Sequence, residues 1–402
     1  MNRGMRLVAL VMAFGLALAG GIVPAADESA RGVAALGWEL VRASGDGDAI
    51  VSPVSVWEAL AMTHAGARGE TAAEIARVLG MADDREAIAA ASESLRRACA
   101  EARGEKITLD VANRLWVQRG KKLEEPFTTA LEARFAAAAG IVDFQAAAEA
   151  ARGEINRWVS DKTARKIDEL LKPGSVGPLT RLVITNAVYM KAGWATPFEK
   201  NVTRPEPFTL PGGTKADVPF MHRSGKMAAG KVGAGPAAAT VCEIPYTGQR
   251  LAMVLVVPDA VDGLPQVLAG LDGEWRKNWR DVRRREVILS LPKWTARKPL
   301  SLNAALGGLG MKRAFAAGAA DFSGMDGTRD LSVSAVVHEG FVEVNEEGTE
   351  AAAATGVVVG VTSVAPDLDP PLAVKADRPF AWAVVDRVTG TILFAGTVTD
   401  PR

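Results

Sequence analysis

The sequence predicts an α+β protein, with helices in the first half of the chain and β-strands in the second half. Apolar residues recur at helical spacing between residues 53 and 162, and β-branched apolar runs follow from residue 182 onward. Helices and strands do not alternate along the chain, which argues against a parallel sheet built from βαβ units. Apolar residues make up 48% of the 402 residues, enough for a large buried core.

The first half of the chain contains most of the expected helices. Residues 49–51 form the end of a strand, and the apolar spacing after Ser52-Pro53 predicts a helix over SVWEALAMTHAGA. Thr71 and Glu74 have the spacing of a capping box at the start of the next helix, which Gly80 ends. Further helical patterns cover 85–103, 123–138, 147–162 and 300–316.

The strand patterns lie mainly in the second half. Residues 182–190 (LVITNAVYM) are apolar on both faces, which predicts a strand buried on both sides of its sheet. Length alone predicts two or three domains, but no Pro- or Ser-rich linker marks a boundary. The other expected strands are 251–257, 287–291, 331–344, 379–385 and 391–398.

Charge and composition exclude several functions. The 47 basic and 47 acidic side chains cancel, so the chain has no net field to attract nucleic acid or a charged membrane. Three histidines and two cysteines leave little room for a metal centre, and no metal or cofactor is expected. Cys99 and Cys242 are expected to be separate thiols, although one bridge between them is possible. Without a Gly-x-Ser-x-Gly motif, serine hydrolase activity is not favoured either.

The N-terminal segment 1–25 has the organisation of a secretory signal peptide. Arg3 and Arg6 precede a long apolar run, which ends in the small residues that a signal peptidase requires. A membrane anchor is the alternative, since the run is just long enough to span a bilayer. We expect cleavage near Ala26 and a mature protein that is secreted or periplasmic.

One segment between two strands fits neither a helix nor a polar loop. Residues 348–374 (GTEAAAATGVVVGVTSVAPDLDPPLAV) contain no Lys, Arg, His or aromatic residue. A loop this long in a compact domain is expected to be functional or disordered. As a strand, it would bury Thr349, Ala351 and Ala353 on one face and turn its only early charge, Glu350, to the other. The segment is therefore predicted to be a loop whose residue pattern also suits a β-strand, with a flexible linker or frayed helix as the alternative.

This segment and its surroundings resemble the serpins, the serine protease inhibitor family. NEEGTEAAAATG after VSAVVHEGFVEV resembles the serpin hinge, IVSPVSVWEALAMTHAGARGETAAEIARVLG an early serpin segment, and DRPFAWAVVDRVTGTILFAGTVTDP the C-terminal signature. The resemblance covers the mature chain. It implies one domain over 26–402, with three β-sheets, eight or nine helices and an exposed reactive-centre loop at about 346–373. It also implies a metastable monomer whose partner is a protease.

The resemblance also assigns site residues. Polar residues beneath the main sheet would form the shutter, and Asn186 in its apolar strand needs such partners in any case. Lys293 and Glu346 would form an ion pair in the breach, where the loop first enters the sheet. The assigned residues are Gly348, Thr349, Glu350, Ala351, Ala352, Ala353 and Ala354 in the hinge, Ser52, Ser55, Asn186 and His338 in the shutter, and Trp194, Lys293 and Glu346 in the breach.

The reactive bond is expected at Thr362–Ser363, the fourteenth residue of the hinge counted from Thr349 and the residue after it. Bonds one or two residues earlier are the alternatives. In each register the residue before the bond is small or β-branched, which suits an elastase-like or subtilisin-like serine protease, or a papain-like cysteine protease, better than trypsin. A non-inhibitory serpin acting as a binding protein or chaperone is the rival function. The basic run 274–286 is expected to be a solvated helix face, with polyanion binding as the alternative.

Overall fold

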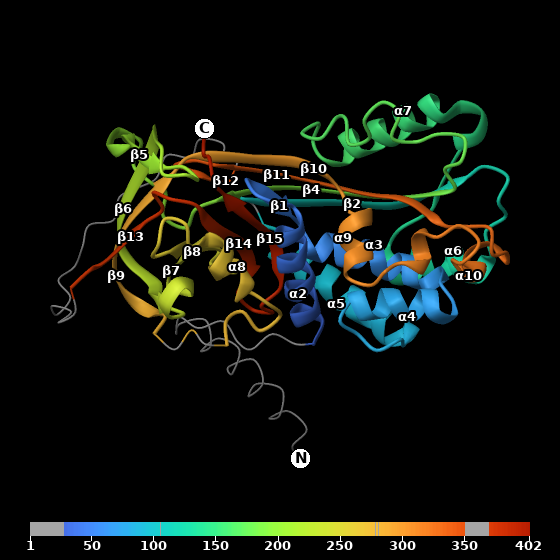
Figure 1. The fold of residues 1–402 in the computed structure, drawn as a ribbon, viewed down its shortest axis with the longest axis horizontal. Helices are drawn as coiled ribbons and strands as arrows, with labels where there is room; N and C mark the ends of the chain where they lie inside the picture. Colours follow the sequence, from blue (N-terminus) through green and yellow to red (C-terminus); the bar gives the residue numbers. More distant parts are fainter. Residues whose placement is uncertain (1–27, 105, 278, 280, 350–369) are drawn as a thin grey trace, which may run out of the picture.

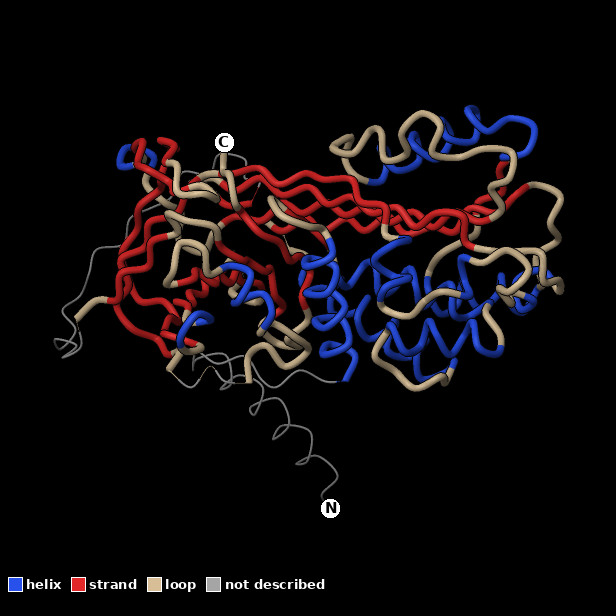
Figure 2. Tube along the Cα trace, viewed as in Figure 1, coloured by secondary structure: helices blue, strands red, loops and turns tan. Residues whose placement is uncertain are grey.

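The computed structural model describes residues 28–402 except for 105, 278, 280 and 350–369. The predicted signal peptide therefore lies outside the described residues. Most helices gather at one end of the molecule and most strands at the other, and one long sheet crosses both ends (Figures 1 and 2). The α-helices of the described part are α2 (Glu28–Ala43), α3 (Pro53–Gly66), α4 (Gly69–Val78), α5 (Arg85–Ala102), α6 (Glu125–Phe135), α7 (Phe144–Lys162), α8 (Leu264–Ala269), α9 (Asn303–Gly308) and α10 (Ser323–Asp326).

Six strands form the long sheet, which we call the main sheet. β4 and β11 pair directly and in parallel from Leu182 and Val333 to Tyr189 and Phe341, whereas the short β12 lies between them at one end. Residues 182–190 are buried throughout, which confirms that this strand is covered on both faces. In spatial order the strands are β10 (Trp294–Ser301), β11 (Val333–Val344), β12 (Gly348–Thr349), β4 (Leu182–Gly193), β2 (Ile107–Gln118) and β3 (Gly140–Val142).

The other described strands form one hydrogen-bonded sheet, so the structure has two sheets rather than the expected three. The reason is that β6 and β9 run without interruption and pair along ten residues, from Phe220–Pro292 to Ala229–Arg283. They thereby join the strands on either side into one sheet. The strands are β1 (Ala49–Val51), β15 (Ile392–Val398), β14 (Phe380–Asp386), β8 (Leu251–Pro258), β7 (Ala239–Pro245), β6 (Lys215–Val232), β9 (Arg283–Pro292) and β13 (Leu372–Lys375), with β5 (Arg204–Thr209) beside β6.

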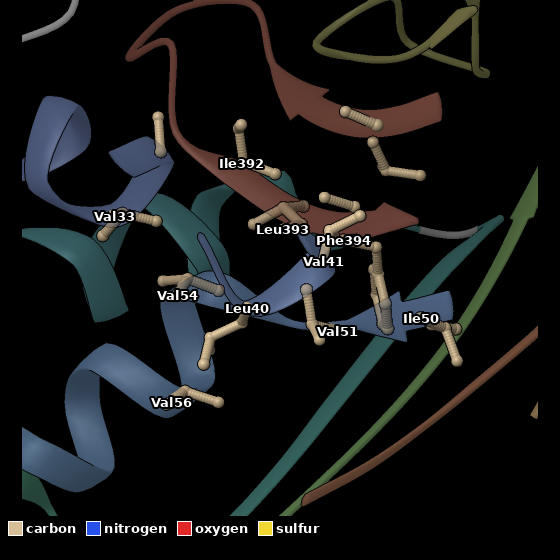
Figure 3. Packing of buried hydrophobic residues seen from close by; sticks show 14 of the residues in the cluster. Val33, Leu40, Val41, Ile50, Val51, Val54, Val56, Ile392, Leu393 and Phe394 are labelled. Carbon is tan, nitrogen blue, oxygen red and sulfur yellow. The ribbon is translucent and has the colours of Figure 1, made fainter. Parts of the chain in front are cut away.

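The core joins the helical end to this second sheet. Val33, Leu40 and Val41 of α2 pack with Ile50 and Val51 of β1 and with Ile392, Leu393 and Phe394 of β15 (Figure 3). Helix α3 is buried over its whole length beneath the main sheet, and α7 covers the opposite face through Phe144, Ile155 and Trp158 (Figure 1). The chain thus places α3 directly under β2 and β4, with Ser52 at its N-terminus hydrogen-bonded to His338 of β11.

Two local predictions are wrong, each because a tertiary contact overrides the local pattern. The helix expected at 300–316 is divided, because Leu300 and Ser301 belong to β10 and Gly310 adopts φ of 109° after α9. The capping box at Thr71 and Glu74 does not form. Thr71 Oγ1 accepts from the Asp321 N–H instead, and Glu74 Oε2 from the N–H groups of Lys312 and Arg313.

The basic run 274–286 is not a helix face. Its described residues form turns as far as residue 281, and β9 begins at Arg283. Cys99 and Cys242 are free thiols, which confirms that they do not pair. Among the described residues, no helix is long and apolar enough to cross a membrane.

Candidate functional site

The candidate site is the end of the main sheet where β12 separates β4 from β11. Thr349 pairs with Val344 of β11 and with Ala192 of β4, and Gly348 pairs with Gly193. Both pairings are antiparallel. The first two residues of the predicted hinge therefore already form a short strand inside the sheet. The hinge residues Glu350 and Ala351–Ala354 and the expected reactive bond Thr362–Ser363 lie outside the described residues.

Thr349 is held by an aromatic wall. Its side chain is fully buried, and its Oγ1 lies 2.6 Å from the hydroxyl of Tyr246. Burial raises the pKa of Tyr246, so this hydroxyl stays protonated. The Tyr246 ring stacks on Trp194 with ring centroids 4.6 Å apart. The neutral hydroxyl of Tyr246 thus satisfies the buried hydroxyl of Thr349.

Gly348 is required by the close approach of β4. Its φ is 157°, and a Cβ at this position would lie 2.1 Å from the Ala192 carbonyl oxygen and 2.7 Å from Gly193 Cα. Both contacts are with backbone, which cannot rotate away. A side chain here would push β12 out of the sheet.

The breach residues surround β12 at the same end. Trp194 Nε1 donates to the Asn345 carbonyl at 2.9 Å, and the Trp194 N–H donates to the Glu347 carbonyl at 2.9 Å. Lys293 Nζ lies 3.0 Å from Glu346 Oε2, and Thr203 Oγ1 donates to Glu346 Oε1 at 2.9 Å. Burial opposes ionisation of Glu346, but hydrogen bonds from the backbone, Lys293 and Thr203 together lower its pKa. Glu346 is therefore a partnered carboxylate beside the hinge.

The four predicted shutter residues meet beneath β4 and β11. His338 Nε2 accepts from the Ser52 N–H at 3.0 Å, so its proton is on Nδ1, which donates to Asn186 Oδ1. Asn186 Nδ2 in turn donates to Ser55 Oγ. Burial lowers the pKa of His338 to about 3, so the ring is neutral at physiological pH. Both ring nitrogens are occupied, and neither is free to act as a catalytic base.

Two further residues extend the shutter and were not predicted. Ser55 Oγ donates to Asn113 Oδ1 at 2.8 Å, and Asn113 Nδ2 donates to Glu58 Oε2 at 3.3 Å. Glu58 lies in the otherwise apolar stretch of α3, and its Oε1 has no hydrogen-bond partner among the described residues. Glu58 could have been found as the only carboxylate of a mostly apolar helix. Asn113 gave no such signal, because its strand (ITLDVANRLWVQ) alternates with polar and charged residues.

The site combines a parted sheet end with a polar network beneath the sheet. One sheet is parted at its end by two residues, and the pairing below them is parallel, unbroken from Phe341 to Ala335, with a register shift before Val333. Beneath this pairing, polar side chains link β4, β11, α3 and β2 through hydrogen bonds that can be exchanged. Polar groups of this kind can exchange hydrogen-bond partners when strands separate. Separating strands that are held by apolar contacts alone would expose apolar surface, at a higher free-energy cost.

Comparisons with known proteins agree with this geometry. The family model described as serpin (serine protease inhibitor) matches residues 33–401. A serpin-like protein of Thermococcus kodakarensis, described as uncharacterised, is 38% identical over 90% of this chain and 82% of its own length. The leukocyte elastase inhibitors of Xenopus tropicalis and Homo sapiens are 36% and 35% identical, each over 88% of this chain and 93% of the relative.

Solved structures show the same fold. Serpin48 of Tenebrio molitor matches with a TM-score of 0.80 at 29% identity, covering 93% of this chain and 96% of that one. Uncleaved ovalbumin matches with a TM-score of 0.81 at 22% identity, which supports the fold alone. The expected α+β serpin fold is confirmed. With a family model across the chain and relatives named as inhibitors, this protein belongs to the serpin family and is a protease inhibitor rather than an enzyme.

Proposed function

We propose that this serpin traps its target as a suicide substrate. The protease nucleophile attacks the carbonyl before the reactive bond, the peptide bond breaks, and the new amine leaves with a proton. The cleaved loop then enters the main sheet between β4 and β11 before water hydrolyses the acyl bond. The observation that carries this proposal is β12, since the hinge is already hydrogen-bonded to both of the strands that must part.

The register of β12 supports insertion along the whole sheet. Thr349 pairs with Val344 and Ala192, so position 355, six residues on, would pair with His338 and Asn186, each six residues back. His338 and Asn186 now pair with each other. An inserted strand would therefore place Thr355, an uncharged hydroxyl, in the shutter in the gap that opens between these two side chains.

The length of the loop also suits the sheet. In the same register, position 359 would pair with Leu182 and position 360 with Val333, where the parallel pairing of β4 and β11 ends. About 11 inserted residues at roughly 3.3 Å each would carry an attached protease on the order of 35 Å. The proposed bond at Thr362–Ser363 lies just beyond this point, which leaves the acylated end clear of the sheet.

The proposed target is an elastase-like or subtilisin-like serine protease, with a papain-like cysteine protease as the other candidate. A small or β-branched residue before the bond fits a shallow pocket, and it offers nothing to the buried carboxylate of a trypsin-like pocket. The relatives named leukocyte elastase inhibitor support the same class. We further propose that residues 1–25 direct export, because their charge and apolar pattern is that of a signal peptide.

A protease panel tests the proposal directly. The protein is incubated with elastase, subtilisin, papain and trypsin, and complexes that survive denaturing electrophoresis are quantified. We expect a stable complex with elastase or subtilisin, and a released C-terminal peptide that begins at Ser363. Cleavage without any stable complex would overturn the inhibitory mechanism and favour the binding-protein or chaperone function.

Thr349→Arg tests insertion itself. A guanidinium here would have to be buried beside the neutral hydroxyl of Tyr246, at a cost of several kcal/mol, so hydrolysis should outrun insertion. We expect the variant to be cleaved as a substrate with little complex. Thr349→Ser, which keeps the hydroxyl, is the matched control and should form complex normally. Full complex yield from Thr349→Arg would show that burial of residue 349 beside Tyr246 is not needed for insertion.

A further inference from the structure

A small basic pocket lies directly behind the breach. Its volume is about 140 Å³, roughly four to five times the space that one water occupies in the liquid. Four cationic side chains line it, against one carboxylate, Glu243, and an otherwise neutral wall. These cations come from three separate places in the fold: Arg223 and Lys226 from β6, Arg284 from β9, and Arg387 from the turn between β14 and β15.

The single carboxylate is already shared. Glu243 is almost fully buried, and it lies 3.5 Å from Arg387 Nε and 4.0 Å from the guanidinium of Arg276. Arg276 is buried as well, and none of its side-chain nitrogens has a hydrogen-bond partner among the described residues. Burial, reinforced by the nearby charge of Arg387 and opposed by Glu243, lowers the pKa of Arg276 to about 10. One negative charge thus faces two guanidinium groups.

The other three cations of the pocket have no acidic partner. Within the described part of the chain, no carboxylate lies within 4.0 Å of the charged groups of Arg223, Lys226 or Arg284. Glu286 stands opposite Lys226 in the β6–β9 pairing but does not line the pocket. Arg223 is held in position, since it donates to the Thr196 carbonyl and lies over the ring of Phe198 at 5.6 Å. The pocket therefore has excess positive charge and a positioned guanidinium.

We propose that this pocket binds a free tetrahedral oxyanion of the size of a phosphate ion. Guanidinium groups present paired N–H donors that match phosphate and sulfate oxygens, and two more cations at the mouth, Lys226 and Arg284, add attraction. The volume admits one such group. The pocket does not involve the reactive-centre loop, so the proposal stands independently of the inhibitory mechanism.

The position of the pocket couples it to the hinge. Its wall includes Ala195 and Pro245, the residues next to Trp194 and Tyr246, which form the aromatic wall around Thr349. The Ala195 N–H donates to the Pro245 carbonyl at 2.9 Å, so both segments belong to one backbone ladder. An anion held by Arg223 would restrain this ladder. It would thereby stabilise the native sheet with β12 in place.

Thermal unfolding without any protease tests the site. The unfolding temperature is followed with increasing inorganic phosphate, and with chloride at equal ionic strength as the reference. We expect a saturable rise in phosphate alone. The double variant Lys226→Gln/Arg284→Gln should weaken phosphate binding by about tenfold or more. The control Arg97→Gln/Lys215→Gln removes the same charge from exposed side chains that do not line the pocket, and it should bind as the wild type does.

Dextran sulfate is the second probe, because it separates a small-ion site from general attraction of polyanions. A response to phosphate that is lost only in the pocket variant supports the site. A response to dextran sulfate alone, no saturable response to phosphate, or an equal loss in both double variants would overturn the proposal. The protease panel reports on inhibition separately, so failure of one idea leaves the other standing.

Discussion

Glu58 allows a direct test of the polar network beneath the main sheet. Its carboxylate is buried within α3, where Oε2 accepts a 3.3 Å hydrogen bond from Asn113 and Oε1 has no partner among the described residues. Burial raises its pKa to about 8, although Arg96 and Asn113 act in the opposite direction. We predict that Glu58→Gln stabilises the protein at neutral pH and changes little at pH near 5.

The sign and size of the predicted stability change follow from the raised pKa of Glu58. Unfolded Glu58 ionises near pH 4.5, whereas the folded protein keeps it protonated up to about pH 8. The contribution of this pKa difference to the free energy of unfolding is therefore complete at low pH. It is lost as pH rises through this window, by about 1.4 kcal/mol per pH unit. Between pH 5 and 7 the wild type should lose about 2 to 3 kcal/mol that Glu58→Gln, which cannot ionise, does not lose.

Denaturant unfolding, followed by tryptophan fluorescence across this pH range, measures the difference. Glu132→Gln, an exposed carboxylate of α6, is the matched control and should leave the pH profile unchanged. The free-energy gap between Glu58→Gln and wild type should widen with pH. A gap that stays constant from pH 5 to 8 would refute the reasoning, because the carboxyl would then ionise alike in both states.

Three further predictions concern single contacts. Gly348→Ala should lower the unfolding temperature and release the hydrogen-exchange protection of β12, because its Cβ would meet the Ala192 oxygen at 2.1 Å; unchanged protection would contradict this. Lys293→Gln should cost about 1 kcal/mol at neutral pH, and the loss should shrink both at high salt and in acid that protonates Glu346. Cys242, buried with its pKa raised to about 12, should resist alkylation until the protein unfolds, as mass spectrometry of labelled protein can establish.

The parts of the site that could be predicted are those with a local signal. Asn186 in a strand that is apolar on both faces requires polar partners, and His338 and Ser55 supply them in the structure, whereas Ser52 contacts His338 through its backbone N–H. The hinge is expected from the small residues that fill a long stretch, and its part from Glu350 onward stays a prediction. The contact of Tyr246 could not be predicted, since nothing in its own segment indicates that a residue 103 positions later contacts its hydroxyl.

The errors have one physical cause. Thr71 and Glu74 have the spacing for a capping box, but their side-chain oxygens accept hydrogen bonds from backbone N–H groups of a distant segment instead. Leu300 and Ser301 were assigned to a helix, but β11 offers them strand partners at His338 and Val337. Pairing between distant segments determined these outcomes, and a single sequence contains no information on such pairing.

The Glu58 prediction also bears on the proposed mechanism. A buried carboxyl under β2 and β4 raises the free energy of the folded state at neutral pH, and the hydrogen-bond chain from Glu58 through Asn113 and Ser55 reaches Asn186 at the seam that must open. If insertion at Asn186 frees Asn113 to pair better with Glu58, part of that cost is relieved, and the loop-cleaved protein should show a weaker pH dependence of unfolding than the intact one. If intact and cleaved protein show the same pH dependence of unfolding, the free-energy cost of burying Glu58 is equal in the two forms. Glu58 then affects stability without driving insertion. Comparing intact and cleaved protein, each with and without Glu58→Gln, separates these two cases.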